Sequence, residues 1–329
     1  MKVLLLGATG LLGHNVLLSL LEHGHNVVAL VRSSATLRDI DSTDLSVVKG
    51  SILDKDDLLR AAEGCESIIN CSGTTDMALL RYKDYLPVNR DLCSMLVELM
   101  DETGIKSLVH VSTANTIGYG SASKLADENE EMQPPFSHSF YALSKKEGES
   151  LLESTAQQNA ERHIIILNPG FMVGPYDVKP SSGKLLLAAY KKPLMAAPRG
   201  GKSFVHVKDV AEAAVNAMTM GCSGQRYLLT GENMSLKDFY ALQSEVCGYR
   251  QRMISLPNLL VSFAGCIGDI IRFLHIPTQL STRNVRQLQV MEYYDNSKAV
   301  RELNMPQTPI AEAIREFYKW RKKQEKTDY

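Results

Sequence analysis

Three glycines at regular spacing follow the first apolar run of the chain, and this feature constrains the fold more than any other. The run Val3–Leu6 leads into Gly7-Ala8-Thr9-Gly10-Leu11-Leu12-Gly13, and a segment of helical periodicity, Leu11–Glu22, follows directly. In such a unit the first glycine permits a sharp turn, the second lets the backbone approach a pyrophosphate, and the third allows close helix–strand packing. The helix N-terminus supplies unpaired N–H groups for the anion. The sequence therefore predicts a dinucleotide site that includes Gly7, Thr9, Gly10, Leu11, Leu12 and Gly13.

Further apolar runs alternate with helical segments through the first 170 residues. Continuous apolar runs separated by helices are typical of a parallel sheet whose two faces are both covered. We therefore predict an α/β fold built on a Rossmann-type doubly wound parallel sheet. The additional runs are Val27–Val31, Leu45–Val48, Ser67–Cys71, Leu108–Ser112 and Ile164–Leu167, and the helical segments between them include Leu58–Ala62, Asn89–Glu102 and Tyr141–Thr155.

The pattern changes after Pro169-Gly170. Prolines, serines and glycines crowd residues 175–201, which predicts loops with one short helix between them. A helix over Val207–Met220 and a strand over Arg226–Leu229 are expected to return to the sheet, and the chain after Ser235 is expected to be mostly helical. The prediction is a dinucleotide-binding domain over 1–170, rejoined by 204–231, with a smaller, mostly helical substrate-binding part over 171–203 and 232–329.

The longest apolar stretch, Leu256–Ile276, is interrupted by Pro257, Asp269 and Arg272. Its large apolar residues recur at helical spacing, so they mark one face of a helix rather than a membrane span. We expect a buried helix or a lid over a moderately apolar substrate, and the alternative is a surface helix that contacts lipid.

Charge and cysteine content exclude several other classes of protein. The 36 Lys and Arg residues against 37 Asp and Glu residues leave a net charge of −1, which suggests neither nucleic acid nor an anionic membrane as a partner. The six cysteines are scattered without a Cys-x-x-Cys pair, so we expect neither a disulfide framework nor a metal site. These features predict a cytoplasmic protein.

Tyr141 and Lys145 form the candidate catalytic pair. Positions four apart share one face of a helix, so both side chains point into the same cleft. The pKa of a free tyrosine is near 10, and a lysine ammonium, together with the positive charge of an oxidised nicotinamide, would lower it. Tyr141 could then donate a proton to a carbonyl oxygen, or accept one in the reverse direction.

The end of the second strand bears on the choice of cofactor. A carboxylate is expected there when the ribose 2′-hydroxyl is free, but the chain has Val31-Arg32. A guanidinium can pair with a 2′-phosphate and stack on adenine, which favours NADP, and makes NAD the less favoured cofactor. The alternative is that Arg32 is an ordinary solvent-facing residue.

Together these motifs resemble the extended short-chain dehydrogenase/reductase superfamily, the NAD-dependent epimerases and dehydratases. Val31-Arg32 and the segment Tyr293–Ala299 resemble its dihydroflavonol 4-reductase-like members in particular. The resemblance covers nearly the whole chain. Its further landmarks are Pro87-Val88-Asn89-Arg90, Pro169-Gly170, Gly174-Pro175 and the segment Phe204–Val210.

The resemblance implies roles for individual residues. Thr113 takes the place of the catalytic Ser or Thr that hydrogen-bonds the substrate oxygen, with Ser112 as the neighbouring candidate, and Lys145 would also bind the nicotinamide ribose. Asp54 either lies near the adenine or is the N-cap of the next helix. The remaining cofactor contacts are expected from Cys71, Ser72, Gly73, Asn89, Pro169, Gly170, Phe171, Met172 and Val173.

The activity that the resemblance implies is NADPH-dependent reduction of a ketone or aldehyde, with hydride transfer and protonation by Tyr141. One alternative is a nucleotide-sugar epimerase that retains NAD, against which Arg32 argues. Another is a non-catalytic NADP-binding regulator, which would usually lack the Tyr–Lys pair. Dehydratases follow the catalytic Thr with Asp-Glu, but this chain has Ala114-Asn115. Relatives often form dimers through two long helices, here about 89–103 and 141–157, so both a homodimer and a monomer remain open.

Overall fold

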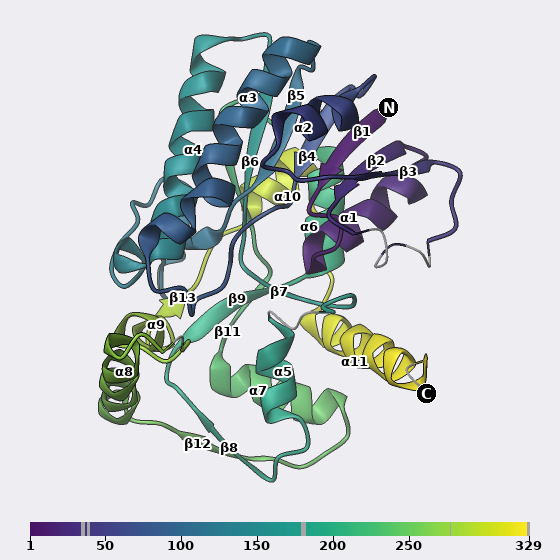
Figure 1. The fold of residues 1–329 in the computed structure, drawn as a ribbon. Helices are drawn as coiled ribbons and strands as arrows, with labels where there is room; N and C mark the ends of the chain where they lie inside the picture. The colour runs from purple at the N-terminus through teal and green to yellow at the C-terminus, as the bar shows by residue number, and fades with distance from the viewer. Residues whose placement is uncertain (34–36, 38–39, 179–181, 277, 328–329) are drawn as a thin grey trace.

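The computed structural model describes residues 1–33, 37, 40–178, 182–276 and 278–327. Residues 34–36, which follow the second strand, and residues 179–181, within the expected substrate-binding segment 171–203, therefore lie outside the described part. Seven strands form the main sheet in the order β10-β6-β5-β4-β1-β2-β3, and every pair in it is parallel (Figure 1). These strands are β1 (Lys2–Leu6), β2 (Asn26–Val31), β3 (Leu45–Lys49), β4 (Ser67–Asn70), β5 (Ser107–Val111), β6 (His163–Pro169) and β10 (Arg226–Leu229).

Helices cover both faces of this sheet, because alternate residues of each strand point to opposite sides. Val3 and Leu5 of β1 pack into one apolar cluster with α1 (Leu11–Glu22), α6 (Val207–Asn216) and α10 (Ser297–Leu303). Leu4 and Leu6 pack on the other side with α2 (Lys55–Ala62), α3 (Leu92–Thr103) and α4 (Phe140–Gln158). The prediction of a Rossmann-type doubly wound sheet is confirmed. Its strand order reverses between β1 and β4, where such folds form a ligand crevice.

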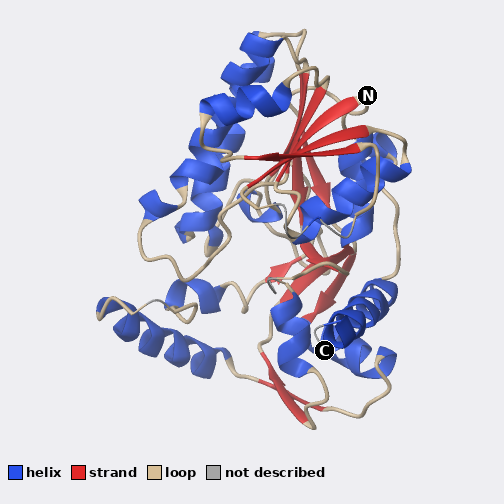
Figure 2. Ribbon diagram, turned by 45° about the vertical axis from the view of Figure 1, so that its right-hand side comes forward, coloured by secondary structure: helices blue, strands red, loops and turns tan. Residues whose placement is uncertain are grey.

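A smaller part lies beyond the carboxyl ends of these strands (Figures 1 and 2). It holds a four-stranded sheet of β7, β9, β11 and β13, a two-stranded ribbon of β8 and β12, and five helices among the described residues. The strands are β7 (Phe171–Val173), β8 (Leu194–Ala197), β9 (Gly201–His206), β11 (Glu232–Ser235), β12 (Arg252–Ser255) and β13 (Met291–Glu292). The helices are α5 (Gly183–Ala189), α7 (Leu236–Val246), α8 (Asn258–Phe273), α9 (Thr282–Arg286) and α11 (Ile310–Thr327).

The prediction of loops with one short helix over residues 175–201 was wrong in two places, where the structure has the strand β8 and the start of the strand β9. β9 is a buried strand, and Phe204 within it stacks on Phe239 of α7 with ring centroids 4.0 Å apart. Its partners β11 and β13 are distant in sequence: Gly201 pairs with both Ser235 and Met291. Local proline and glycine content favoured loops, but long-range pairing and burial decide the conformation.

Helix α8 also differs from the prediction of a buried helix or lid. Its buried positions are Val261, Gly265 and Gly268, while its large apolar side chains are exposed to solvent. Helical periodicity locates an apolar face but does not determine whether that face or the opposite one meets the rest of the protein. No helix within the described residues is both long and apolar enough to cross a membrane.

Candidate active site

Two adjoining clefts lie at the carboxyl ends of β1, β2, β4 and β5. The first has a volume of about 390 Å³ and is lined by the glycine loop, the end of β2 and residues 50–53. The second, of about 470 Å³, extends from the glycine loop to Tyr141 and Lys145. Both clefts share Thr9, Gly10, Arg32, Cys71, Ser72 and Gly73, so together they form one elongated crevice.

The glycine loop has the geometry that its sequence predicts. Gly7 has a φ of +83°, and a Cβ there would lie 2.8 Å from the Cys71 carbonyl carbon. A Cβ on Gly13 would overlap the Gly7 carbonyl oxygen, so helix and strand meet closely. Gly10 is the N-cap of α1, and no side chain caps the helix there. Unpaired amides of the first helical turn therefore border the crevice, which suits a phosphate group.

Tyr141, Thr113 and Ser112 come together at the second cleft. Tyr141 lies in the first turn of α4, whose N-cap Ser139 accepts a hydrogen bond from the Ala142 amide at 3.4 Å. Tyr141 and Ser112 line the cleft, and the Thr113 side chain is close enough to act on the Tyr141 phenol through a hydrogen bond. Burial raises the pKa of Tyr141 to about 12, and the bond with Thr113 partly opposes that rise. In the protein alone, Tyr141 is therefore a protonated phenol.

Lys145 lies one turn further along α4 and is buried. Its Nζ donates to the Val111 carbonyl oxygen at 2.7 Å and lies 3.2 Å from Nε2 of His110. Burial lowers the pKa of Lys145, and the groups that act on the pKa of Tyr141 are its own burial, Thr113 and Glu149. The expected lowering of the Tyr141 pKa by Lys145 is therefore absent from the protein alone.

The sequence analysis missed His110, which is fully buried on β5. Its Nδ1 lies 3.2 Å from the Asn70 amide nitrogen on β4, and the Asn70 oxygen accepts a hydrogen bond from the Ser72 amide at 3.0 Å. Burial and the charge of Lys145 hold the pKa of His110 well below 6.5. A polar residue inside the apolar run Leu108–Val111 was the signal that could have identified it.

Two buried hydroxyls provide a test of whether a cofactor fits. Oγ of Ser72 and Oγ of Ser112 have no hydrogen-bond partner among the described residues, and both residues line the crevice. A buried hydroxyl without a partner costs free energy, so both atoms are suited to accept or donate a bond to a ligand. Together with the uncapped start of α1, they fit a dinucleotide that lies along the crevice.

Arg32 and Asp54 were both candidates to lie near the adenine, and the structure gives them different positions. Arg32 is exposed at the end of β2 and lines both clefts. Asp54 caps α2, because its Oδ1 accepts a hydrogen bond from the Asp57 amide at 2.9 Å, and it does not line either cleft. Asp54 was expected either near the adenine or as a helix N-cap, and in the structure it is the N-cap. Ser51 and Ile52, which line the first cleft, were missed.

Asn89 is not brought into the crevice. Its side chain accepts from the Thr74 amide at 2.8 Å and donates to the Thr74 carbonyl oxygen at 3.0 Å and to Ser144 Oγ at 2.9 Å. These bonds tie the loop after β4 to α4, which is a structural role.

Within the segment 169–173, one residue lines the crevice. Met172 lines the second cleft, whereas Phe171 and Val173 belong to the apolar core of the smaller part. Pro169 pairs with Leu229 of β10, and Gly170 packs against the Ser203 carbonyl oxygen. Neither Pro169 nor Gly170 lines the two clefts.

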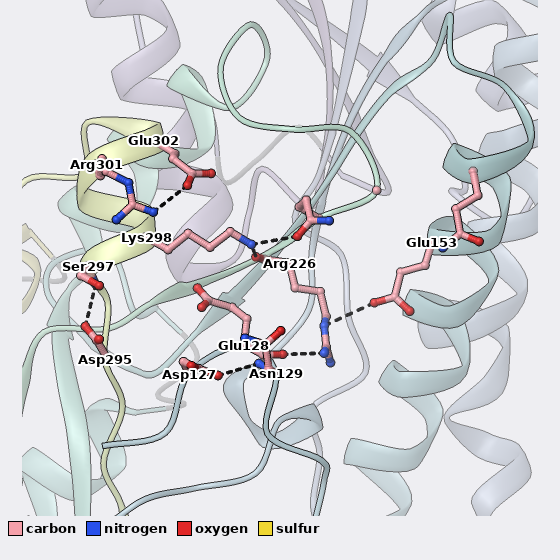
Figure 3. Close-up of a pocket in the computed structure, with 13 residues that line it drawn as sticks. Asp127, Glu128, Asn129, Glu153, Arg226, Asp295, Ser297, Lys298, Arg301 and Glu302 are labelled. Carbon is pink, nitrogen blue, oxygen red and sulfur yellow. Dashed lines mark hydrogen bonds and ion pairs between the residues drawn. The ribbon is translucent and has the colours of Figure 1, made fainter. Parts of the chain in front are cut away.

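A third cleft, of about 520 Å³, is larger but has a different character (Figure 3). It lies beside β10 at the edge of the main sheet, and its charged side chains form hydrogen bonds or ion pairs within the protein. Arg226 contacts Glu153 at 3.3 Å, and Lys298 Nζ donates to Gln225 at 3.0 Å. This pairing indicates a structural role, so we place the active site at the first two clefts.

Comparison with known proteins agrees with this geometry. The model of the NAD dependent epimerase/dehydratase family matches residues 3–229, and the chain belongs to that family. The chain is 28% identical over 325 residues to a Synechocystis protein named "Putative dihydroflavonol 4-reductase", covering 95% of this chain and 92% of that one. It is 24% identical over 324 residues to sterol demethylase protein B of Methylococcus capsulatus, covering 97% and 98%.

The fold is shared with solved structures of the same superfamily. UDP-glucose 4-epimerase of Thermotoga maritima superimposes with a TM-score of 0.78 at 18% identity, covering 98% of this chain and 99% of the other. The extended short-chain dehydrogenase/reductase resemblance, with dihydroflavonol 4-reductase-like character, is confirmed. The chain is an NAD(P)-dependent oxidoreductase of this type.

Proposed function

We propose that the protein reduces a ketone or aldehyde with NADPH. The observation that carries this proposal is the single cleft that Tyr141, Lys145 and the glycine loop line together, with Thr113 beside Tyr141. Because burial keeps the phenol of Tyr141 protonated, it is available as a proton donor near neutral pH. This state suits the reductive direction.

In this proposal, bound NADPH supplies the hydride. The amides at the start of α1 would hold the pyrophosphate, and Lys145 would bind the nicotinamide ribose. Thr113 orients the substrate carbonyl, and Tyr141 donates its phenolic proton to the carbonyl oxygen as the alcohol forms.

The preference for NADPH over NADH is argued from Arg32. The β2 strand ends without a carboxylate, and Arg32 lies exposed where both clefts meet. A guanidinium there pairs with the 2′-phosphate of NADPH and has no such partner in NADH. The remaining expected contacts, including Cys71, Gly73 and Met172, stay predictions.

The class of substrate is argued from the second cleft and the relatives. Leu11, Leu12, Met172 and Val178 give that cleft an apolar portion. The names of the two relatives refer to a dihydroflavonol and a sterol, which are both built on fused rings. We propose a ketone or aldehyde on a largely apolar molecule, without specifying the ring system.

A nucleotide-sugar epimerase is the second candidate, supported by the fold shared with UDP-glucose 4-epimerase. It would retain NAD, for which Arg32 offers no ribose hydroxyl acceptor. A non-catalytic regulator would have no use for the Tyr141–Lys145 pair. The cytoplasmic location and a homodimer through α3 and α4 stay predictions.

Replacement of Tyr141 by phenylalanine tests the proposal. With aromatic aldehydes and cyclic ketones as probes, we expect Tyr141→Phe to lower the rate of NADPH oxidation by roughly 100-fold or more. The affinity for NADPH, measured by fluorescence titration, should change little. Tyr249→Phe is the matched control, because that hydroxyl contacts Ala189 outside both clefts. Full activity in Tyr141→Phe would refute the proton-donor role.

A further inference from the structure

One side of α8 presents a continuous row of large apolar side chains to solvent. Their exposed fractions range from 44% for Ile267 to 82% for Phe273. A helix of this length extends about 24 Å, so the row is longer than the scattered apolar residues of an ordinary surface. We call this surface the α8 face; it consists of Leu259, Leu260, Phe263, Ile267, Ile270, Phe273 and Leu274.

The α8 face is held outward by the small residues on the opposite side of the helix. A Cβ on Gly268 would overlap the Leu280 carbonyl oxygen, and a Cβ on Gly265 would lie 2.8 Å from the Thr282 Cα. The helix therefore packs against residues 280–285 through glycines. Rotation that buried Phe263 would bring large side chains into this close contact, so the apolar face stays exposed.

The ribbon that leads into α8 adds apolar and basic residues to the same end of the molecule. In the parallel pairing of β8 and β12, Leu194 lies beside Arg252, so both share one face of the ribbon with Ile254. Leu194 and Ile254 are 52% and 45% exposed. Figures 1 and 2 place the ribbon and α8 at the end of the molecule away from the seven-stranded sheet.

The charge around the ribbon is mostly positive. The basic side chains exposed there include Lys191, Lys192, Arg250 and Arg252. Two acidic residues lie near, Glu245 on α7 and Asp269 on α8, and the Asp269 carboxylate accepts a hydrogen bond from the Thr282 amide at 3.1 Å. This local excess of positive charge is hidden in the overall net charge of −1.

We propose that the α8 face and the β8–β12 ribbon bind the surface of an anionic lipid bilayer. An amphipathic helix of this kind lies in the interface with its apolar side among the acyl chains, while nearby cations meet anionic headgroups. A second copy of the chain fits less well, because a symmetric contact would bring the basic side chains of each copy together.

The docking surface is attached to the active site from two sides. Arg272 of α8 donates to the carbonyl oxygens of Met77 at 3.2 Å and Leu79 at 2.7 Å, in the loop that follows the crevice residues of β4. Arg283 of α9 lies 3.7 Å over the ring of Phe140, next to Tyr141. Lipid binding would thus place the active site beside the membrane surface, where an apolar substrate dissolves; this consequence alone rests on the proposed function.

Flotation of the full chain with vesicles tests lipid binding without any turnover. We expect the protein to float with vesicles of phosphatidylcholine and phosphatidylglycerol, and less with phosphatidylcholine alone. The double variant Phe263→Ser/Phe273→Ser should lower the bound fraction roughly tenfold. Lys191→Glu/Arg252→Glu should lower binding to the anionic vesicles. Leu125→Ser, at an exposed apolar residue outside this surface, is the matched control and should bind like the unaltered protein.

Two outcomes would overturn the proposal. One is an absence of binding, or binding that the Phe263→Ser/Phe273→Ser variant retains. The other is a protein that is a dimer in solution and becomes a monomer in that variant, which would assign the α8 face to a second copy. NADPH titration of the same variants shows whether the nucleotide site is intact, so a failure of lipid binding is distinguishable from a failure of the proposed reductase.

Discussion

Removal of the buried His110 imidazole should change how stability depends on pH. The folded protein holds the pKa of His110 well below 6.5, because the ring is fully buried and faces Lys145. The unfolded chain has no such constraint, and its histidine takes up a proton as the pH falls through about 6.5. The free energy of unfolding therefore falls on acidification below that pH and is unaffected by His110 above it.

The size of this effect follows from linkage. One proton that only the unfolded state binds lowers the free energy of unfolding by about 1.4 kcal/mol for each pH unit of acidification. Between pH 6.5 and about pH 5 the loss is about 2 kcal/mol. His110→Gln keeps an amide that can hydrogen-bond but cannot titrate, so its stability should fall less steeply with acidification. Urea unfolding at a series of pH values measures both slopes.

The control for this experiment is His138→Gln, at an exposed histidine, which should have the slope of the unaltered protein. Burial also lowers the pKa values of His14 and His206. Both histidines are present in all three proteins, so they add the same amount to each slope. Equal slopes for His110→Gln and the unaltered protein would refute the argument that His110 is neutral in the folded state.

Four further substitutions separate stability from function. Gly13→Ala should lower the free energy of unfolding by about 2–3 kcal/mol and abolish nucleotide binding, because its Cβ would overlap Gly7, and unaltered thermal unfolding would contradict this. Asp54→Ala should lose about 1 kcal/mol as a helix cap with NADPH affinity intact in a titration, whereas a tenfold weaker affinity would indicate a cofactor contact. Arg32→Asp should shift the ratio of NADPH to NADH affinity at least roughly tenfold toward NADH, and an unchanged ratio would exclude Arg32 as the discriminator. Ser112→Ala should keep its melting temperature while kcat/KM falls roughly tenfold, since this hydroxyl has no partner among the described residues, and destabilisation with full activity would contradict it.

The parts of the fold that depend on local pattern were predicted from the sequence. The apolar runs that became β1, β2 and β5 and the glycine loop at Gly7–Gly13 follow from short-range periodicity and turn chemistry. β9 was missed because its partners β11 and β13 come later in the chain, and no local signal specifies that pairing.

In the candidate site, too, the features that depend on local spacing were predicted and the tertiary contacts were not. Tyr141 and Lys145 share a helix face at a spacing that the sequence displays, and the structure places both at the second cleft. The contact between Lys145 and His110 joins α4 to β5, so it depends on tertiary packing. The outward orientation of α8 was likewise not predictable, since it depends on which side meets residues 280–285.

The central claim is that this is an NADPH-dependent reductase, and nucleotide binding tests it most directly. Isothermal titration of the purified protein with NADPH, NADP, NADH and NAD should show reversible binding, with NADPH favoured over NADH at least roughly tenfold. The protein should also purify without a retained nucleotide. Tightly held NAD after purification, with no preference for NADPH, would contradict the account and favour the nucleotide-sugar epimerase.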